Sequence, residues 1–152
     1  MSLLSKLDRP YIFNMNHLNI SKATSHPLAL YKNHLEFNGY QIIEEGEKHL
    51  FCTHRRKLDL ILNYFSHYHG VLFVSIFSFK RTINRSEILE YINELNSSFL
   101  TINAHIDGGN NLIFQSFFQG DYDRTNFSLF LDNIDCDKDI WLNNELTSLY
   151  FA

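Results

Sequence analysis

Two histidines separated by one residue are the first candidates for chemistry in this chain. His67 and His69 stand in a His-Tyr-His-Gly segment, and on an extended strand their side chains would point to the same side. Imidazole is a common zinc ligand, but a zinc site needs three or four ligands, and no third one stands nearby in the sequence. We therefore interpret the pair as a solvated turn and predict no metal site.

Carboxylates form the second candidate group. Asp121 and Asp123, together with Asp107, suggest a calcium site or acid–base catalysis, but the glutamate that closes an EF-hand loop is absent. Asp121 and Asp123 also precede a predicted helix, whose N-terminus favours acidic residues. We interpret them as helix-start residues, and the acidic run Asp135–Asp139 as a solvated helix face or a break between two helices.

The remaining reactive or charged groups also have ordinary structural explanations. Cys52 stands in a predicted strand without a neighbouring base, which indicates a buried, inert thiol. The basic cluster His54–Lys57 predicts a hairpin turn, with contact to an acidic partner segment as the alternative. We find no nucleophile elbow, phosphate-binding glycine loop or HExxH motif. The sequence therefore predicts no catalytic residues, no cofactor and no enzyme activity.

Composition limits the class of protein. The chain has 152 residues, of which 45% are hydrophobic, as expected for one globular domain with its own core. Residues 107–152 hold two Lys or Arg against eight Asp or Glu, which argues against general nucleic-acid binding. Cys52 and Cys136 do not form a CxxC pair, so we expect reduced thiols. No signal peptide or membrane-length apolar run is recognisable, so we predict a cytoplasmic protein without membrane insertion.

The stretch from Val71 onward carries the clearest structural signals. Val71–Phe79 is apolar on both alternating faces, which predicts a strand covered on both sides. A helix should begin at Asn84, with Glu87 completing a capping box and Ile83 meeting Ile88 in a hydrophobic staple.

A β-hairpin follows this helix. Residues 100–106 and 112–118 both alternate between apolar and polar side chains, which is strand periodicity. A three-residue loop, Gly108–Asn110, pairs Ala104 with Phe114 and places the apolar sets of both strands on one face. A two-residue loop would place them on opposite faces, because a one-residue slip reverses every side chain, so we predict the three-residue loop.

The other predicted elements complete an α+β domain. They are a helix that begins at Pro27 and is closed by Asn38-Gly39, strands at Tyr40–Glu44, Leu50–His54 and Leu58–Phe65, and a last helix that starts near Asp123 and continues toward Trp141. This order, helix–strands–helix–hairpin–helix, predicts an antiparallel sheet with helices packed on it. We assign residues 27–152 to this domain and residues 1–26 to an N-terminal arm, in which Tyr11–Phe13 is a short edge strand or a cover for an edge.

The element order resembles the fold shared by type III secretion chaperones and YbjN-like domains. The local resemblance is strongest over Ser86 to Ile134: the middle helix ends in the sequence Ile92–Asn96, two strands follow around Gly108-Gly109, and an acidic amphipathic helix carries Phe127. The resemblance implies a small, acidic, cytosolic homodimer that binds a protein segment and catalyses nothing. Secretion chaperones of this class hold an extended effector segment along sheet and helix surfaces.

The hairpin register also predicts where a partner would bind. The predicted surface is the hairpin face opposite Ala104 and Phe114, together with the minority face of a neighbouring strand, and consists of Ile61, Phe65, Thr101, His105, Ile113 and Phe117. The alternative is that the N-terminal arm or the last helix covers these residues and makes them core.

Three functions remain open from the sequence. The first is a chaperone or adaptor that holds a segment of a partner or effector protein. The second is a YbjN-like regulatory or structural dimer without a client. The third is a small-ligand binder or enzyme with an aromatic pocket, which would require a closed pocket of roughly 300 Å³ or more.

Overall fold

The structure, a computed structural model, describes residues 26–151. Its elements in chain order are α2 (Ala29–Phe37), β1 (Gln41–Glu45), β2 (His49–Thr53), β3 (Leu60–Phe65), the short 3₁₀-helix η2 (Ser66–Tyr68), β4 (Gly70–Ser78), α3 (Arg85–Ser98), β5 (Asn103–Ile106), β6 (Asn111–Gln119), α4 (Arg124–Asn143) and α5 (Thr147–Tyr150). The strands form one six-stranded antiparallel sheet in the order β1-β2-β3-β4-β6-β5. This confirms the predicted α+β class and element order. The proposed arm, residues 1–26, lies outside the described residues except for His26.

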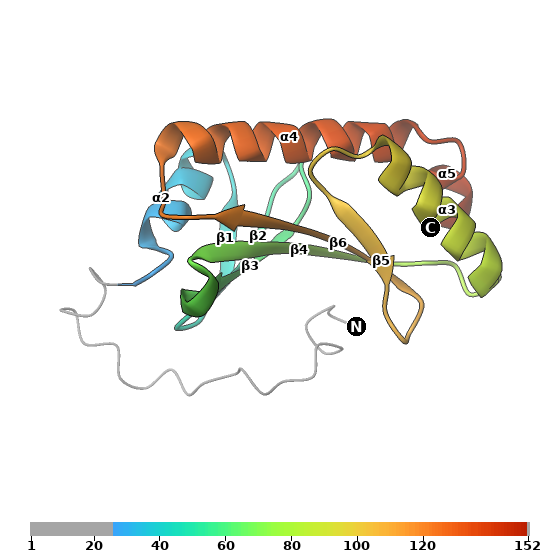
Figure 1. The fold of residues 1–152 in the computed structure, drawn as a ribbon, viewed down its shortest axis with the longest axis horizontal. Coiled ribbons are helices and arrows are strands. Elements are labelled where there is room, and N and C mark those ends of the chain that lie inside the picture. Colours follow the sequence, from blue (N-terminus) through green and yellow to red (C-terminus); the bar gives the residue numbers. More distant parts are fainter. Residues whose placement is uncertain (1–25, 152) are drawn as a thin grey trace.

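The helices pack on one side of the sheet (Figure 1). α4 runs along that side, with α2 near one of its ends and α3 and α5 near the other. In the central strand β4, Val71 and Phe73 are buried beneath the helices, whereas Leu72, Val74 and Ile76 are half-buried on the opposite face. Within residues 26–151 the helices form a single layer, so none of the described helices provides the predicted cover on the second side of this strand.

The N-terminus of α3 has the predicted capping box. The Asn84 side chain accepts a hydrogen bond from the Glu87 amide at 3.0 Å, and the Glu87 carboxylate accepts one from the Asn84 amide at 3.2 Å. Two amides that the first helical turn would leave without acceptors are thereby satisfied. Ile88, one residue beyond the box, is fully buried, so the cap fixes the position at which the apolar stripe of α3 meets the sheet.

The β5–β6 hairpin has the predicted register. Ala104 pairs with Phe114 and His105 with Ile113. The Asp107 carboxylate accepts hydrogen bonds from the amides of Gly109 and Asn111, both within 2.9 Å, and so holds the loop closed. The apolar sets of both strands consequently share one face, as the three-residue loop requires.

A buried carboxylate shortens β5 at its start. Asp137, in the middle of α4, is 1% exposed, and it accepts hydrogen bonds from the amides of Leu100 at 3.0 Å and of Thr101 and Ile102 at 2.7 Å each. These amides are therefore not available for strand pairing, and β5 begins at Asn103 instead of Leu100. The prediction of a solvated face or a helix break at Asp135–Asp139 is wrong, because α4 is continuous and Asp137 is part of the interior.

Two other predicted starts are displaced by two residues. α2 begins at Ala29 instead of Pro27, because the Leu28 amide donates to His26 Nδ1 at 3.1 Å and the preceding residues form a turn. Gly39 follows α2 as predicted, with a φ of 88° that favours glycine.

β3 begins at Leu60 instead of Leu58. The Asp59 carboxylate accepts a hydrogen bond from the His54 amide at 3.3 Å. This contact extends the turn that joins β2 to β3, so the strand starts only after it.

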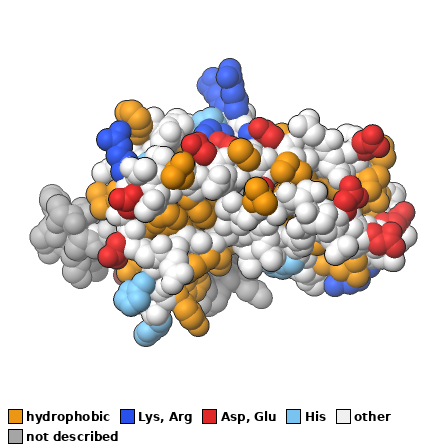
Figure 2. Space-filling model, turned by 45° about the horizontal axis from the view of Figure 1, so that its top comes forward, with side chains coloured by type: hydrophobic (Ala, Val, Ile, Leu, Met, Phe, Trp, Pro, Cys, Tyr) orange, Lys and Arg blue, Asp and Glu red, His pale blue; other side chains and the backbone are white. Residues whose placement is uncertain are grey.

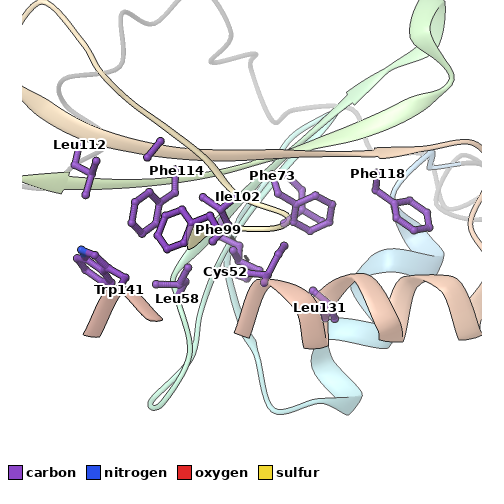
Figure 3. Packing of buried hydrophobic residues seen from close by; sticks show 14 of the residues in the cluster. Cys52, Leu58, Phe73, Phe99, Ile102, Leu112, Phe114, Phe118, Leu131 and Trp141 are labelled. Carbon is purple, nitrogen blue, oxygen red and sulfur yellow. Dashed lines mark hydrogen bonds between the residues drawn. The ribbon is translucent and has the colours of Figure 1, made fainter. Parts of the chain in front are cut away.

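The core lies between the sheet and the helices and is rich in aromatic rings (Figure 3). The ring of Phe114 lies 5.4 Å from that of Phe99 and 5.2 Å from that of Trp141, in edge-on contacts. Farther along the sheet, Phe73 packs against Phe127 at 5.8 Å. Such aromatic pairs stabilise a core beyond the area they bury.

Candidate partner-binding surface

The face of the sheet opposite the helices is the candidate functional site, and we call it the outer face. Its large apolar side chains come from four strands and are Phe51 of β2, Ile61 and Phe65 of β3, Leu72, Val74 and Ile76 of β4, and Ile113 and Phe117 of β6. The outward positions of β3, β4 and β6 carry no Asp, Glu, Lys or Arg. The central strands of the outer face are therefore both apolar and uncharged.

The strand register brings these side chains together. Val74 pairs with Ile61 of β3, Leu72 pairs with Phe117 of β6, and Ile76 pairs with Ile113 of β6. Residues paired across antiparallel strands have their Cβ atoms about 5 Å apart on the same face. The apolar side chains therefore form one continuous patch.

The structure brings together five of the six residues predicted for the partner surface. These five are Ile61, Phe65, His105, Ile113 and Phe117, which share the outer face by register. Thr101 does not join them, because it precedes β5 and its amide donates to Asp137 in the helix layer.

The sequence prediction missed part of the patch. Leu72, Val74 and Ile76 form its centre, and Phe51 extends it to β2. The signal that identifies them is the second apolar face of residues 71–79, which strand periodicity alone places in the interior.

Three aromatic residues at one end of the outer face are exposed, and we call them the aromatic corner. Phe65 is 40%, Tyr68 70% and Phe117 41% exposed, and the rings of Phe65 and Tyr68 lie 6.3 Å apart. Phe117 lies over the backbone of Gly70, where an added Cβ would stand 2.4 Å from the Phe117 Cζ atom. The absence of a side chain at position 70 therefore leaves room for the Phe117 ring beside β4.

Polar side chains lie within the patch and at its edge. Asn63 of β3, Gln115 of β6 and His105 of β5 are all partly exposed on this face. Amides of Asn and Gln offer both donors and acceptors to a bound chain. The outer face therefore combines apolar contact area with neutral hydrogen-bonding groups.

The other candidate groups of the sequence have structural roles or are isolated. Cys52 is buried, which raises the pKa of its thiol to about 12, and its Sγ donates to the Leu60 carbonyl at 3.5 Å. This confirms a buried thiol without the features of a nucleophile. Within residues 26–151, no three His, Cys, Asp or Glu side chains come together as metal ligands. His67 lies within the exposed η2 turn, and His69 follows it directly.

The basic turn between β2 and β3 packs on the acidic side of α4. Lys57 forms a 2.6 Å ion pair with Asp135, and Lys138 donates to the Arg56 carbonyl at 3.3 Å. The positive charge of Lys57, which the sequence made a candidate contact for an acidic partner, is therefore paired with Asp135 within the domain. In the view that brings the helix layer forward, acidic and hydrophobic side chains are interspersed (Figure 2).

The aromatic residues pack against one another instead of lining a closed pocket. A void of about 10 Å³ lies between the sheet and α4, beside Leu58, Phe73 and Ile134, which is room for about one water molecule. A larger hollow of about 790 Å³ beside Tyr40 and His54 is an open surface feature. Neither of these two spaces is an enclosed pocket of ligand size lined by aromatic residues.

Comparison with known proteins extends the resemblance found in the sequence. The sequence matches no protein-family model and no curated protein. The structure resembles YbjN, described as a putative transcription regulator from E. coli, with a TM-score of 0.62 and 14% identity over 82% of this chain and 95% of that chain. It also resembles a chain of the heterodimeric ExoU–SpcU complex from the type III secretion system of Pseudomonas aeruginosa, with a TM-score of 0.52 and 15% identity over 78% of this chain and 95% of that chain.

These matches confirm the fold that the sequence suggested. The chain has a YbjN-like, type III secretion chaperone-like fold. Among residues 26–151, every helix is too short or too polar to cross a bilayer.

Proposed function

We propose that this protein is a non-catalytic protein-binding module, a cytoplasmic chaperone or adaptor that holds a segment of a partner protein on its outer face. The observation that carries the proposal is the continuous, uncharged apolar patch centred on Leu72, Val74 and Ile76. Continuous apolar patches on the surface of a soluble protein commonly mark an interaction site. The likeness to a chain of a heterodimeric secretion complex supports a protein as the partner.

Packing on the face suits this sheet better than strand addition at an edge. The edge strand β5 has four residues, and the opposite edge strand β1 is irregular between Ile42 and Glu44, where the register shifts. Short and bulged edge strands hinder pairing with another strand. We therefore expect the partner segment to insert apolar side chains between those of the outer face, while Asn63 and Gln115 bond its polar groups.

The protein is also proposed to be a homodimer. Besides the outer face, Phe37 is 83% and Leu100 93% exposed, which leaves further apolar surface for a second copy. Light scattering at micromolar concentration should give about twice the 18.0 kDa chain mass. A mass near that of one chain at all concentrations would contradict the dimer.

A YbjN-like regulatory dimer without a client is the second candidate. The higher TM-score of the YbjN match favours it. The two candidates predict different states of the outer face. In a dimer without a client, the second copy would cover the outer face and make it inaccessible to other proteins.

Affinity capture from the native cell, followed by mass spectrometry, tests the proposal. Phe117→Asp and Ile113→Asp should each abolish partner capture and leave the circular dichroism spectrum and melting temperature nearly unchanged. Leu129→Asp is the matched control, because Leu129 is 55% exposed on α4 in the opposite layer. If the outer-face variants unfold, the face is core; if they capture partners as the control does, the partner site lies elsewhere.

A further inference from the structure

The outer face needs an occupant when no partner is bound. None of the described helices provides it, because α4 and the other helices lie on the opposite side of the sheet (Figure 1). An uncovered apolar patch of this kind is also uncommon on a monomer. The occupant must therefore come from residues 1–25, from a second copy or from another protein.

We propose that the chain's own residues 1–25 occupy the outer face in the free protein, with Tyr11, Ile12 and Phe13 as the anchoring side chains, and that a partner segment displaces them. This inference rests on the proposed function of the outer face and gives that site its regulation.

The first described residue lies at the correct end of the sheet. His26 Nε2 and the Gly46 carbonyl are 2.7 Å apart, and Gly46 belongs to the turn between β1 and β2. β2 begins beside this turn and β3 ends there, since His49 pairs with Asn63. The chain before His26 therefore starts at the end of the sheet that carries the aromatic corner.

The segment is long enough to reach every strand of the patch. From β2 to β6 there are three steps between neighbouring strands, or about 14 Å. Twelve residues separate Phe13 from His26, and in extended form they span up to about 40 Å. Length therefore does not restrict where the three anchors sit.

The composition of the segment complements the rest of the chain. Its large apolar residues after Met1 are Leu3, Leu4, Leu7, Tyr11, Ile12, Phe13, Met15, Leu18 and Ile20. The segment has a net charge of +2, from Lys6, Arg9 and Lys22 against Asp8. Because the whole chain has a net charge of −4, residues 26–152 have a net charge of −6. The apolar residues match the chemistry of the patch, and the positive charges of the segment meet no cation at the outward positions of β3, β4 and β6.

A spin-label experiment on the full chain tests the placement directly. In a Cys136→Ser background, which removes the exposed native thiol, a nitroxide on Asn14→Cys should broaden the methyl signals of Ile61, Val74 and Ile113. The methyl signal of Ile88, on the helix side, should keep its intensity. No broadening at the outer face would overturn the inference.

Two controls identify the source of any broadening. Ile12→Asp combined with Phe13→Asp should abolish it by removing the anchors, and persistence in this variant would overturn the role of these residues. Mixing spin-labelled chains with isotope-labelled chains separates a second copy from the chain itself. Broadening of equal size in the mixed sample would mean that another copy's segment is the occupant, which also overturns the inference.

Competition provides a second, independent readout. The probe is a fluorescent synthetic peptide of residues 1–25, added to the full chain and to the Ile12→Asp/Phe13→Asp variant. In the full chain, the peptide competes with the tethered residues 1–25, whose effective concentration is about 1 mM. If the Kd of the peptide is about 100 µM, it should bind the variant about 10-fold more tightly than the full chain. Equal affinity for both proteins would overturn the inference, as would peptide binding that survives Phe117→Asp in the variant.

The two proposals fail in distinguishable ways. If partner capture depends on Phe117 while the label on Asn14→Cys stays distant, the self-occupancy is wrong and the proposed function stands. If the label lies at the outer face while Phe117→Asp leaves partner capture intact, the self-occupancy stands and the proposed function is wrong.

Discussion

Removing the carboxylate of Asp137 should be among the most destabilising single substitutions in α4. Asp137→Ala leaves the amides of Leu100, Thr101 and Ile102 without their acceptor. A buried donor without a partner costs about 1–3 kcal/mol. The Ile102 amide is buried, whereas those of Leu100 and Thr101 are only partly buried, so water replaces part of their loss. We expect a total loss of about 4 kcal/mol, a large fraction of the roughly 5–15 kcal/mol that stabilises a typical domain.

Asp137→Asn gives an intermediate test. One amide oxygen can keep the two bonds that Oδ2 now accepts from Thr101 and Ile102, but the NH₂ group would then face the Leu100 amide, donor against donor. We expect a loss of about 2 kcal/mol, since one charge-assisted bond is gone and two become neutral.

Guanidinium titration measures these losses. Trp141 is the single tryptophan and is 7% exposed in the core, so its fluorescence reports unfolding alongside circular dichroism. Asp132→Ala is the control, because Asp132 is an exposed aspartate of the same helix and should cost less than about 0.5 kcal/mol. The same midpoint for Asp137→Ala and Asp132→Ala, at equal slopes, would refute the structural role of this carboxylate.

Three further predictions concern other contacts in the helix layer. Asn84→Ala should destabilise by about 1 kcal/mol through loss of the cap, and an unchanged denaturation midpoint would count against the capping box. Tyr91→Phe should cost about 1 kcal/mol, because the Tyr91 hydroxyl and Thr147 Oγ1 form a buried 2.6 Å hydrogen bond; a calorimetric melting temperature equal to that of the wild type would exclude it. Burial, and then the charge of Arg124, lowers the pKa of His34 from 6.5. The unfolded chain thus protonates first, and stability present above about pH 6.5 is lost as the pH falls below it. His34→Gln should weaken this dependence between about pH 7.5 and 5.5 in parallel denaturant titrations, and equal pH dependence in both proteins would contradict it.

Local signals made much of the fold predictable. The cap of α3 depends on Asn84 and Glu87, which are three residues apart, and the hairpin register depends on the length of one loop. Each of these features is decided within a few residues, where backbone geometry and side-chain alternation act directly. The sequence pattern therefore specified them without knowledge of the tertiary structure.

Features that depend on distant segments were not predictable in this way. Asp137 meets its three amides across 35–37 positions of sequence, so nothing in its acidic neighbourhood distinguishes it from exposed Asp132. The same limit applied to Leu72, Val74 and Ile76, whose spacing is equally compatible with a covered and an uncovered face. Thr101 is a further example. Its place in the apolar–polar alternation predicts a strand residue, but its amide donates to the distant Asp137 and does not pair in the sheet.

The close approach of Phe117 to Gly70 links two positions in the evolution of this fold. A Cβ at position 70 would lie 2.4 Å from the ring of Phe117 and 2.5 Å from the Phe118 carbonyl, so only glycine permits both the ring position and the β4–β6 spacing. In homologous chains, we expect a residue other than glycine at this position to occur together with a smaller side chain at the position of Phe117 and with a shift of β6 away from β4. Such correlated substitutions would show that the contact between β4 and β6 depends on this pair. They would also identify homologues that have lost the aromatic corner, because Phe117 is one of its three residues.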